Sequence, residues 1–294
     1  MNYEVTHTTT YNYRDPVSLS HHVLRMTPRG LAHQRCLSHE VQIDPPPAVV
    51  KPHFDYFDNA VTFVTLEGAH KRLTVKSTSK VLVTHPFLPI PAETPAWETV
   101  REFSRGLQIG PSLEACEFIF NSPLVKTMEK FADYARPSFV KDRPILEAVL
   151  DLTRRIYGNF KFDNKATTIS TPLEEVFKNR AGVCQDFAQL QIACLRSLGL
   201  PARYVSGYIE TQPPPGRPRL AGADASHAWF AVYDPDAGWL NFDPTNDQTV
   251  VERHITTAWG REYSDVTPMK GIIFGGGAGH TATVAVDVER VPTN

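Results

Sequence analysis

The sequence predicts an α+β protein in which antiparallel strands come first, helices follow, and strands return after Pro201. Over residues 1–84, and again after Pro201, apolar and polar residues alternate with a period of two, which is typical of half-buried strands. Between these regions, apolar residues recur at steps of three and four, as over residues 145–157, and that spacing indicates helices with one buried face.

The composition is that of a globular protein and limits its partners. The chain has 294 residues, 41% hydrophobic and 21% charged, with a net charge of −2. A nucleic-acid binder usually shows a basic excess, so we expect no nucleic-acid partner. No stretch approaches the roughly 18 apolar residues of a membrane-spanning helix, no signal-peptide pattern opens the chain, and four cysteines are too few for a disulfide framework. We therefore expect no membrane partner and a cytoplasmic protein.

The first region is expected to form an N-terminal β domain over residues 1–90. Six short runs of β-forming residues, with no helical period between them, predict an antiparallel sandwich-like or barrel-like module. Three prolines within residues 86–91 disfavour both helix and strand and indicate a linker. The second domain is then expected to comprise a helical lead-in, a core and C-terminal strands, over residues 91–165, 166–250 and 251–294.

Four helices are expected in the second domain. Prolines in the first turn and preceding capping residues predict helices at 124–135 and 145–157 and a short helix that begins near 172. The fourth helix is expected from near Gly182 to Gly199. It carries an apolar stripe typical of a core helix, formed by Val183, Phe187, Leu190, Cys194 and Leu198.

Cys184 lies in the first turn of this fourth helix. A thiol there is close to unpaired backbone N–H groups and to the positive end of the helix dipole, which both favour the thiolate. Gly182 lets the backbone bend closely before the helix. A buried core thiol is the alternative role for such a cysteine.

A predicted hairpin supplies partners for the thiol. The turn residues 234–238 separate two β-runs. If Val232 pairs with Gly238 across a five-residue loop, His227 lies directly opposite Asp243, with Cβ atoms about 5 Å apart. A set of apolar side chains then shares the opposite face, namely Ala228, Phe230, Val232, Leu240 and Phe242. We interpret Cys184 as a nucleophile, His227 as the group that activates it, and Asp243 as the group that orients the imidazole.

These residues resemble the transglutaminase-like superfamily, and within it the bacterial transglutaminase-like cysteine proteases. The resemblance rests on Gly-Val-Cys-Gln-Asp-Phe-Ala at 182–188, His-Ala-Trp at 227–229 and Phe-Asp-Pro-Thr at 242–245. It covers nearly the whole chain, including the N-terminal β-region. The resemblance implies a papain-like core, in which the cysteine helix packs on an antiparallel sheet that carries the histidine and the aspartate.

Further residues are candidates for parts of a site. An oxyanion hole needs two donors; the backbone N–H of Cys184 is the first, and Asn159 and Gln185 are candidates for the second. We interpret Asp186 as a first-turn acid that stabilises the helix. Trp229 and Trp239 share the face of His227 and are candidates for substrate subsites, with core packing as the alternative.

We expect no metal and no cofactor. His21 and His22 are adjacent on a strand and point to opposite faces, so they cannot chelate one ion simply. There is no Cys-x-x-Cys or His-Glu-x-x-His motif and no loop with calcium-type ligands. A proline-rich loop with Arg217 and Arg219 is a candidate for binding acidic substrates, or else a solvated loop.

The sequence thus predicts a thiol enzyme that acts on peptide or amide carbonyls through a thioester, with a peptide or protein as substrate. Hydrolysis makes it a cysteine peptidase or amidase. Transfer to an amine makes it a transglutaminase, which the same residues allow. A catalytically silent peptide-binding module is the alternative from another class.

Overall fold

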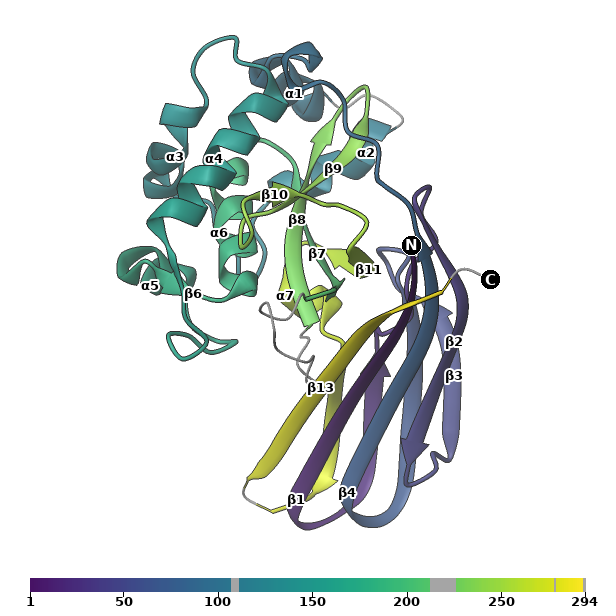
Figure 1. Cartoon of the computed structure of the whole chain (residues 1–294). Helices are drawn as coiled ribbons and strands as arrows, with labels where there is room; N and C mark the ends of the chain where they lie inside the picture. The colour runs from purple at the N-terminus through teal and green to yellow at the C-terminus, as the bar shows by residue number, and fades with distance from the viewer. Residues whose placement is uncertain (107–110, 212–225, 278, 293–294) are drawn as a thin grey trace, which may run out of the picture.

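The computed structural model describes residues 1–106, 111–211, 226–277 and 279–292 and has an α+β fold (Figure 1). The predicted loop with Arg217 and Arg219 lies outside these residues. The helices are α1 (Trp97–Arg105), α2 (Pro111–Cys116), α3 (Glu129–Ala135), α4 (Ile145–Asn159), α5 (Leu173–Asn179), α6 (Cys184–Ser197) and α7 (Tyr263–Val266). Among the described residues, no helix combines the length and the apolar character needed to cross a membrane.

The N-terminal region forms one six-stranded antiparallel sheet. Two long strands are at its centre, β1 (Asn2–Leu24) and β4 (Ala60–Val83). Strand β4 is flanked by β2 (Gln34–Asp44) and β3 (Val49–Phe54), and β1 by β12 (Met269–Gly275) and β13 (His280–Val291). The six short runs expected from the sequence are therefore four strands, because β1 and β4 each join two of these runs.

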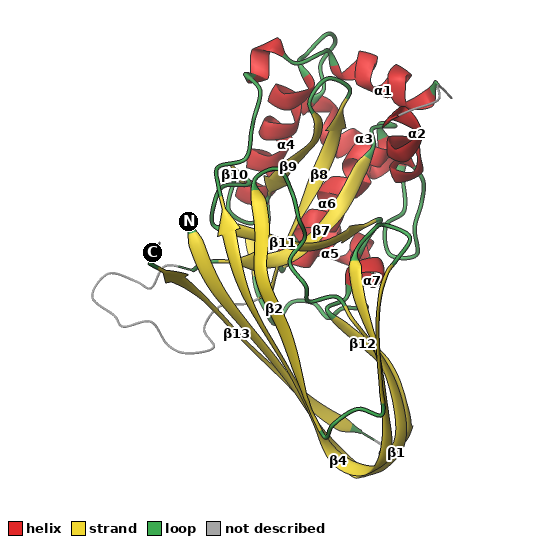
Figure 2. Cartoon of the chain, turned by 90° about the vertical axis from the view of Figure 1, so that its right-hand side faces the viewer, coloured by secondary structure: helices red, strands yellow, loops and turns green. Residues whose placement is uncertain are grey.

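This sheet bends back on itself, which explains its sandwich-like character (Figure 2). The β1–β4 pairing shifts register between Asn12 and Val17 and again between Val17 and Leu19, and such irregularities let a long strand bend. Side chains from both halves of the bend then form one apolar cluster, formed by Tyr13, Val17, Leu24, Met26, Val64, Leu66, Leu73, Val75 and Met269.

The expected second domain includes residues 251–294, but β12 and β13 within this range join the N-terminal sheet. Strand β13 pairs with β1 along Asn2–Tyr13, and β12 pairs with β1 along Val17–Leu24. The physical reason is that β1 would otherwise present an unpaired edge of backbone groups over its whole length. Ala282, Val284, Val286 and Val288 follow the period-two alternation and do lie on a strand, but this strand closes the N-terminal sheet.

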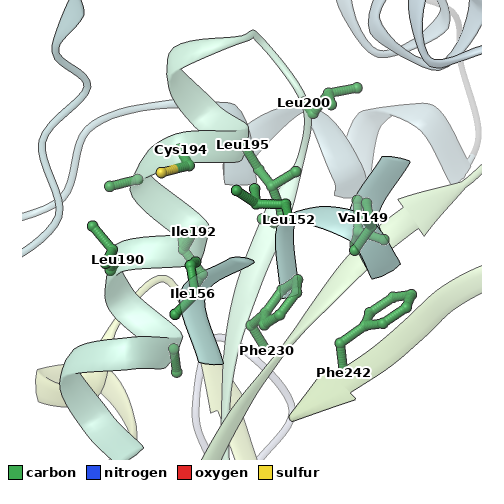
Figure 3. Packing of buried hydrophobic residues seen from close by; sticks show 14 of the residues in the cluster. Val149, Leu152, Ile156, Leu190, Ile192, Cys194, Leu195, Leu200, Phe230 and Phe242 are labelled. Atoms are coloured by element: carbon green, nitrogen blue, oxygen red, sulfur yellow. The ribbon is translucent and has the colours of Figure 1, made fainter. Parts of the chain in front are cut away.

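A five-stranded antiparallel sheet forms the centre of the second domain. Its strand order is β10-β9-β8-β7-β11. The strands are β7 (Ala202–Ile209), β8 (Ser226–Asp234), β9 (Gly238–Asp243), β10 (Gln248–Thr249) and β11 (His254–Gly260); β5 (Lys161–Phe162) and β6 (Ala181–Gly182) form a separate parallel pair. Helices α4 and α6 contribute to the core against this sheet (Figure 3), and the apolar face predicted for the hairpin is buried there.

The helix expected from residue 124 begins later, at Glu129. The backbone N–H of Leu124 donates to Glu262, and that of Thr127 donates to Asn121 Oδ1 at 2.6 Å. These groups are satisfied by side chains, so the segment stays a loop. Helix α6, by contrast, starts two residues after Gly182 and is followed by Gly199 at φ +80°, as the sequence indicates.

Two amide side chains join the N-terminal sheet to the edge strand β11. Gln34 Nε2 donates to the carbonyl of Thr256 and Gln34 Oε1 accepts its N–H, both at 2.8 Å. Asn59 bonds Trp259 in the same two-way manner, at 2.8 and 2.9 Å. Each side-chain amide makes the two hydrogen bonds that the backbone of a neighbouring strand would make, so the edge of the central sheet is covered at these points.

Gly207 of β7 pairs with His227 of β8. Because Gly207 has no side chain, the Ile255 carbonyl and the Trp229 ring can lie close to its backbone. A Cβ at Gly207 would lie 2.0 Å from the Ile255 carbonyl oxygen and 2.7 Å from the Trp229 ring. Both neighbours are buried, so neither can move without disturbing strand pairing or core packing.

We expect Gly207→Ala to lower the free energy of unfolding by about 3 kcal/mol, because overpacking a rigid core displaces backbone. Urea denaturation measures this change. Gly158→Ala is the matched control: its Cβ would meet nothing within 4 Å inside α4, and we expect it to be neutral or to stabilise by about 0.5–1 kcal/mol. Equal effects of the two substitutions would contradict this account.

Candidate active site

The first turn of α6 positions Cys184, which is half-buried. The carboxylate of Asp186 accepts the N–H of Val183 at 2.9 Å and the hydroxyl of Thr167 at 2.6 Å, as expected of a first-turn acid that stabilises the helix. A Cβ at Gly182 would lie 2.6 Å from Asp186 Oδ2, so the glycine permits this cap. Burial raises the pKa of Asp186 and outweighs the two hydrogen bonds, which lower it.

The hairpin that carries the histidine and the aspartate differs in register from the prediction. Asp234 pairs with Gly238 and Phe230 with Phe242, so the loop is 235–237 and the pairing is displaced by two residues. The cause is the Asp234 carboxylate, which accepts the N–H groups of residues 236 and 237 and tightens the turn. An even displacement keeps every side chain on its predicted face, so His227 and Asp243 still meet, diagonally.

His227 and Asp243 form a short hydrogen bond in a buried environment. His227 Nε2 lies 2.7 Å from Asp243 Oδ2, and the aspartate is 0% exposed. The carboxylate also accepts the N–H of Thr245 at 3.0 Å and the side-chain amide of Asn246 at 2.6 Å. These donors hold the carboxylate fixed beneath the imidazole.

The hydrogen bonds also set the protonation of the pair. Burial lowers the pKa of His227, but its hydrogen bonds to Asp243 and Cys184 and the negative charge of both partners outweigh burial and raise it to about 10. Burial likewise raises the pKa of Asp243, and the hydrogen bonds from the two histidines outweigh it, so the pKa lies well below its usual range. Because Nε2 bonds the aspartate, Nδ1 is the ring nitrogen left for the thiol.

His254 is a further member of this cluster that the sequence analysis missed. Its Nε2 lies 3.1 Å from Asp243 Oδ2, and its Nδ1 is 3.2 Å from the N–H of Val251. Nδ1 also lies 3.3 Å from the carbonyl oxygen of Val251, so Val251 does not decide the tautomer. The ionised carboxylate can only accept hydrogen bonds, so Nε2, which faces the aspartate, carries a proton. Burial, the largest influence, lowers the pKa of His254. No local pattern marks His254, because only the pairing of β11 with β7 brings it here.

The two tryptophans on the face of His227 have different surroundings. Trp229 is 0% exposed, its ring lies 5.2 Å from His254, and its Nε1 donates to Asn241 at 3.3 Å. A sealed ring cannot touch a substrate, so packing is its role and the subsite assignment is wrong for Trp229. Trp239 is half-buried and lies next to the turn of the hairpin, at the end away from Asp243. It lines two cavities there.

The two candidates for a second oxyanion donor also separate. Asn159 is exposed at the end of α4, and its amide donates to the Tyr134 hydroxyl at 3.0 Å. Gln185 follows Cys184 directly in the first turn of α6 and is 9% exposed. Gln185 therefore remains a candidate for the second donor, whereas the amide of Asn159 is hydrogen-bonded to Tyr134.

His227, Asp243 and His254 place their potential ligand atoms within 4.8 Å of one another. Such donors can bind a metal ion. Here, however, both Nε2 atoms face the same carboxylate oxygen at hydrogen-bond distance, and each needs its proton for that bond. The arrangement fits a hydrogen-bonded cluster.

Comparison with known proteins identifies the family. Two models match: the bacterial transglutaminase-like N-terminal region over residues 3–82 and the transglutaminase-like superfamily over residues 132–244. An uncharacterized protein of Mycobacterium tuberculosis is 42% identical over 293 residues, which cover 97% of this chain and 92% of the relative. This chain belongs to the transglutaminase-like superfamily.

One further sequence relative and one solved structure are similar to this chain. A protein-glutamine gamma-glutamyltransferase of Pseudomonas aeruginosa is 30% identical over 115 residues, 39% of this chain and 17% of that enzyme. The crystal structure of a "Putative Cysteine Protease" from Cytophaga hutchinsonii has a TM-score of 0.75 at 21% identity, covering 100% of this chain and 92% of that one, and it shares the fold. Membership of this superfamily supports a thiol-dependent hydrolase or acyltransferase.

The raised pKa of His227 predicts a pH dependence of stability. In a Cys184→Ser variant, which removes the thiol from the titration, we expect the free energy of unfolding to fall as the pH rises above about 6.5. The folded protein still holds the His227 proton at a pH where the unfolded chain has released it, so raising the pH favours unfolding until the folded-state pKa is passed. Urea unfolding across this range, compared with Cys184→Ser/His227→Gln, isolates the contribution; identical pH profiles for the two variants would contradict it.

Proposed function

We propose that this transglutaminase-like protein is a thiol hydrolase of peptide or amide bonds in a peptide or protein substrate. The observation that carries the proposal is the 2.7 Å hydrogen bond between His227 and the buried carboxylate of Asp243, together with the interaction of His227 with Cys184 that raises the pKa of the imidazole. In this proposal Cys184 is the nucleophile, His227 the acid and base, and Asp243 the group that orients and charges the imidazole. The predicted cytoplasmic location remains a prediction.

The proposed reaction has two stages. The Cys184 sulfur attacks the carbonyl carbon, and the negative charge that develops on the oxygen is stabilised by the backbone N–H of Cys184, with the Gln185 side chain as the second donor. The carbon–nitrogen bond then breaks, and His227 gives its proton to the departing amine. Water, deprotonated by His227, attacks the thioester and releases the acid and the thiol.

The surroundings of Cys184 favour water as the second nucleophile. Transfer to an amine requires a site that admits the amine and limits water, whereas Cys184 is half-buried and therefore partly open to solvent. A transglutaminase is the second candidate, because the same thioester forms and only the attacking group differs. A silent peptide-binding module would need neither the buried carboxylate nor the paired imidazole.

We expect iodoacetamide to label Cys184 faster than Cys36 at neutral pH, by about tenfold or more, because His227 acts as the base that activates this thiol in the proposed mechanism. Cys36 is a suitable internal control: it is also half-buried, and burial raises its pKa. Cys194 is sealed in the core, where burial raises its pKa to about 12, and should react slowest. Peptide mapping by mass spectrometry measures all three.

In His227→Ala the advantage of Cys184 over Cys36 is expected to disappear while the slow rate of Cys194 persists, which shows that the fold is intact. Equal labelling of Cys184 and Cys36 in the unchanged protein would refute the thiol-enzyme proposal and leave the silent module.

We expect a glutamine-containing peptide library, treated in ¹⁸O-water with a primary amine present, to yield acids carrying ¹⁸O in excess of amine adducts. The reason is the access of water to the thioester at Cys184. Mass spectrometry separates the two products, and Cys184→Ala should yield neither. A majority of amine adducts would instead assign transglutaminase activity.

A further inference from the structure

A cavity of about 840 Å³ lies away from Cys184, between the central sheet, the α2 segment and the turn that joins β3 to β4. Its size is within the range of sites for small molecules. It is lined by Arg203 of β7, Trp239 of β9 and Trp259 of β11, together with residues of the α2 segment such as Leu113 and Phe118.

Along β7, Arg203 lies four residues before Gly207, the partner of His227, which corresponds to roughly 13 Å along the strand. The buried Trp229 pairs with Val205 between these two positions. The cavity is therefore separate from the cluster around Asp243.

Arg203 is the unusual feature of this cavity. It is only 8% exposed, and its Nε is buried without a hydrogen-bond partner. Within the described parts of the chain, no carboxylate lies within 4.0 Å of its guanidinium group. Burial of a cation without a partner costs several kcal/mol, so the protein maintains this side chain at a cost to its stability.

Two aromatic rings hold the guanidinium in a fixed orientation. Its central carbon lies 4.3 Å from the ring centre of Trp239 and 3.8 Å from that of Trp259, while Arg29 stacks at 3.5 Å on Trp259. These rings pack against the guanidinium group and accept no hydrogen bond in its plane, so a ligand would bind its N–H edge. Such a fixed, planar edge matches the two oxygens of a carboxylate.

The other charges at the cavity define the ligand further. Arg29 already has partners, Asn59 at 2.7 Å and Asp58 at 3.6 Å, and Glu117 is hydrogen-bonded to Tyr56. The lining holds two other arginines: Arg105 is exposed to solvent, whereas Arg203 is buried. Among the described residues of this lining, Arg203 is therefore the cation that lacks both water and an ion pair, which suits a single negative charge. The acidic residues of the lining, such as Glu114, disfavour a doubly charged phosphate. The walls contributed by Phe118, Leu113 and Trp239 suit an apolar body.

We propose that this cavity is a second binding site, for a monocarboxylate with an aromatic or aliphatic body, whose carboxylate binds the N–H edge of Arg203. Both a free organic acid and the C-terminal end of a peptide carry this chemistry. Trp239, a candidate for a substrate subsite from the sequence, is in this proposal one of the two rings that pack against Arg203.

Isothermal titration calorimetry with 4-phenylbutyrate and with N-acetyl-Leu-Phe tests the proposal and distinguishes the two sources by which binds more tightly. We expect the matching neutral amides, 4-phenylbutyramide and N-acetyl-Leu-Phe-amide, to bind at least about tenfold more weakly, because they lose a charged hydrogen-bonded pair. Amides that bind as well as the acids, or acids that show no binding at millimolar concentration, would overturn the proposal.

Two variants locate the binding. Arg203→Met keeps the length and stacking of the side chain and should abolish the preference for acids over amides. Leu113→Trp changes a side chain that is 60% exposed, so it should fold normally, fill the cavity and weaken binding of all four probes. Unchanged binding in Leu113→Trp would place the probes elsewhere and overturn the proposal. His227→Ala should bind the probes like the unchanged protein, so this site and the proposed catalysis fail or succeed independently.

Discussion

The buried carboxylate of Asp243 is the constraint around which the second domain is arranged. An ionised carboxylate removed from water is stable only if donors replace its hydration. Four groups do so here, namely the two imidazoles, the Asn246 amide and the Thr245 N–H. These donors come from β8, β11 and the segment after β9, so three separate parts of the chain must be in register for the charge to be tolerated. The proposed catalytic geometry therefore also contributes to the stability of the second domain.

The N-terminal sheet supports the cluster around Asp243 indirectly, through strand β11. Strand β11, which brings His254 to the carboxylate, is an edge strand of the central sheet, and edge strands without partners are prone to move or to pair wrongly. Gln34 and Asn59 bond both backbone groups of Thr256 and Trp259 and thereby hold that edge. An apolar contact between the sheets adds to this, because Tyr3 and Val81 pack with Tyr208 and Ile255. The N-terminal region thus stabilises the histidine that supports the aspartate.

Patterns in the sequence predicted those features of the fold that depend on residues close together in the chain. Period-two alternation identified the face of β8 that is buried on α6, and the glycine and acid around Cys184 predicted the helix start. The register of the hairpin was displaced by two because the Asp234 side chain decides the turn, and the even displacement kept His227 beside Asp243. His254 and the pairing of β12 and β13 with β1 depend on contacts between residues distant in sequence. A single sequence carries no local signal for such contacts.

A buried charge lies near each end of the central sheet, and the two charges differ in how completely they are hydrogen-bonded. At one end, Asp243 accepts hydrogen bonds from four donors, and its surroundings raise the pKa of His227 to about 10. At the other end, Arg203 is held between two indole rings, which supply cation–π attraction but accept no hydrogen bond in the plane of the guanidinium. Stacking alone therefore cannot replace the water that Arg203 loses. A buried charge that is rigidly oriented but incompletely paired is the arrangement that a charged ligand completes, whereas the fully paired Asp243 needs no ligand.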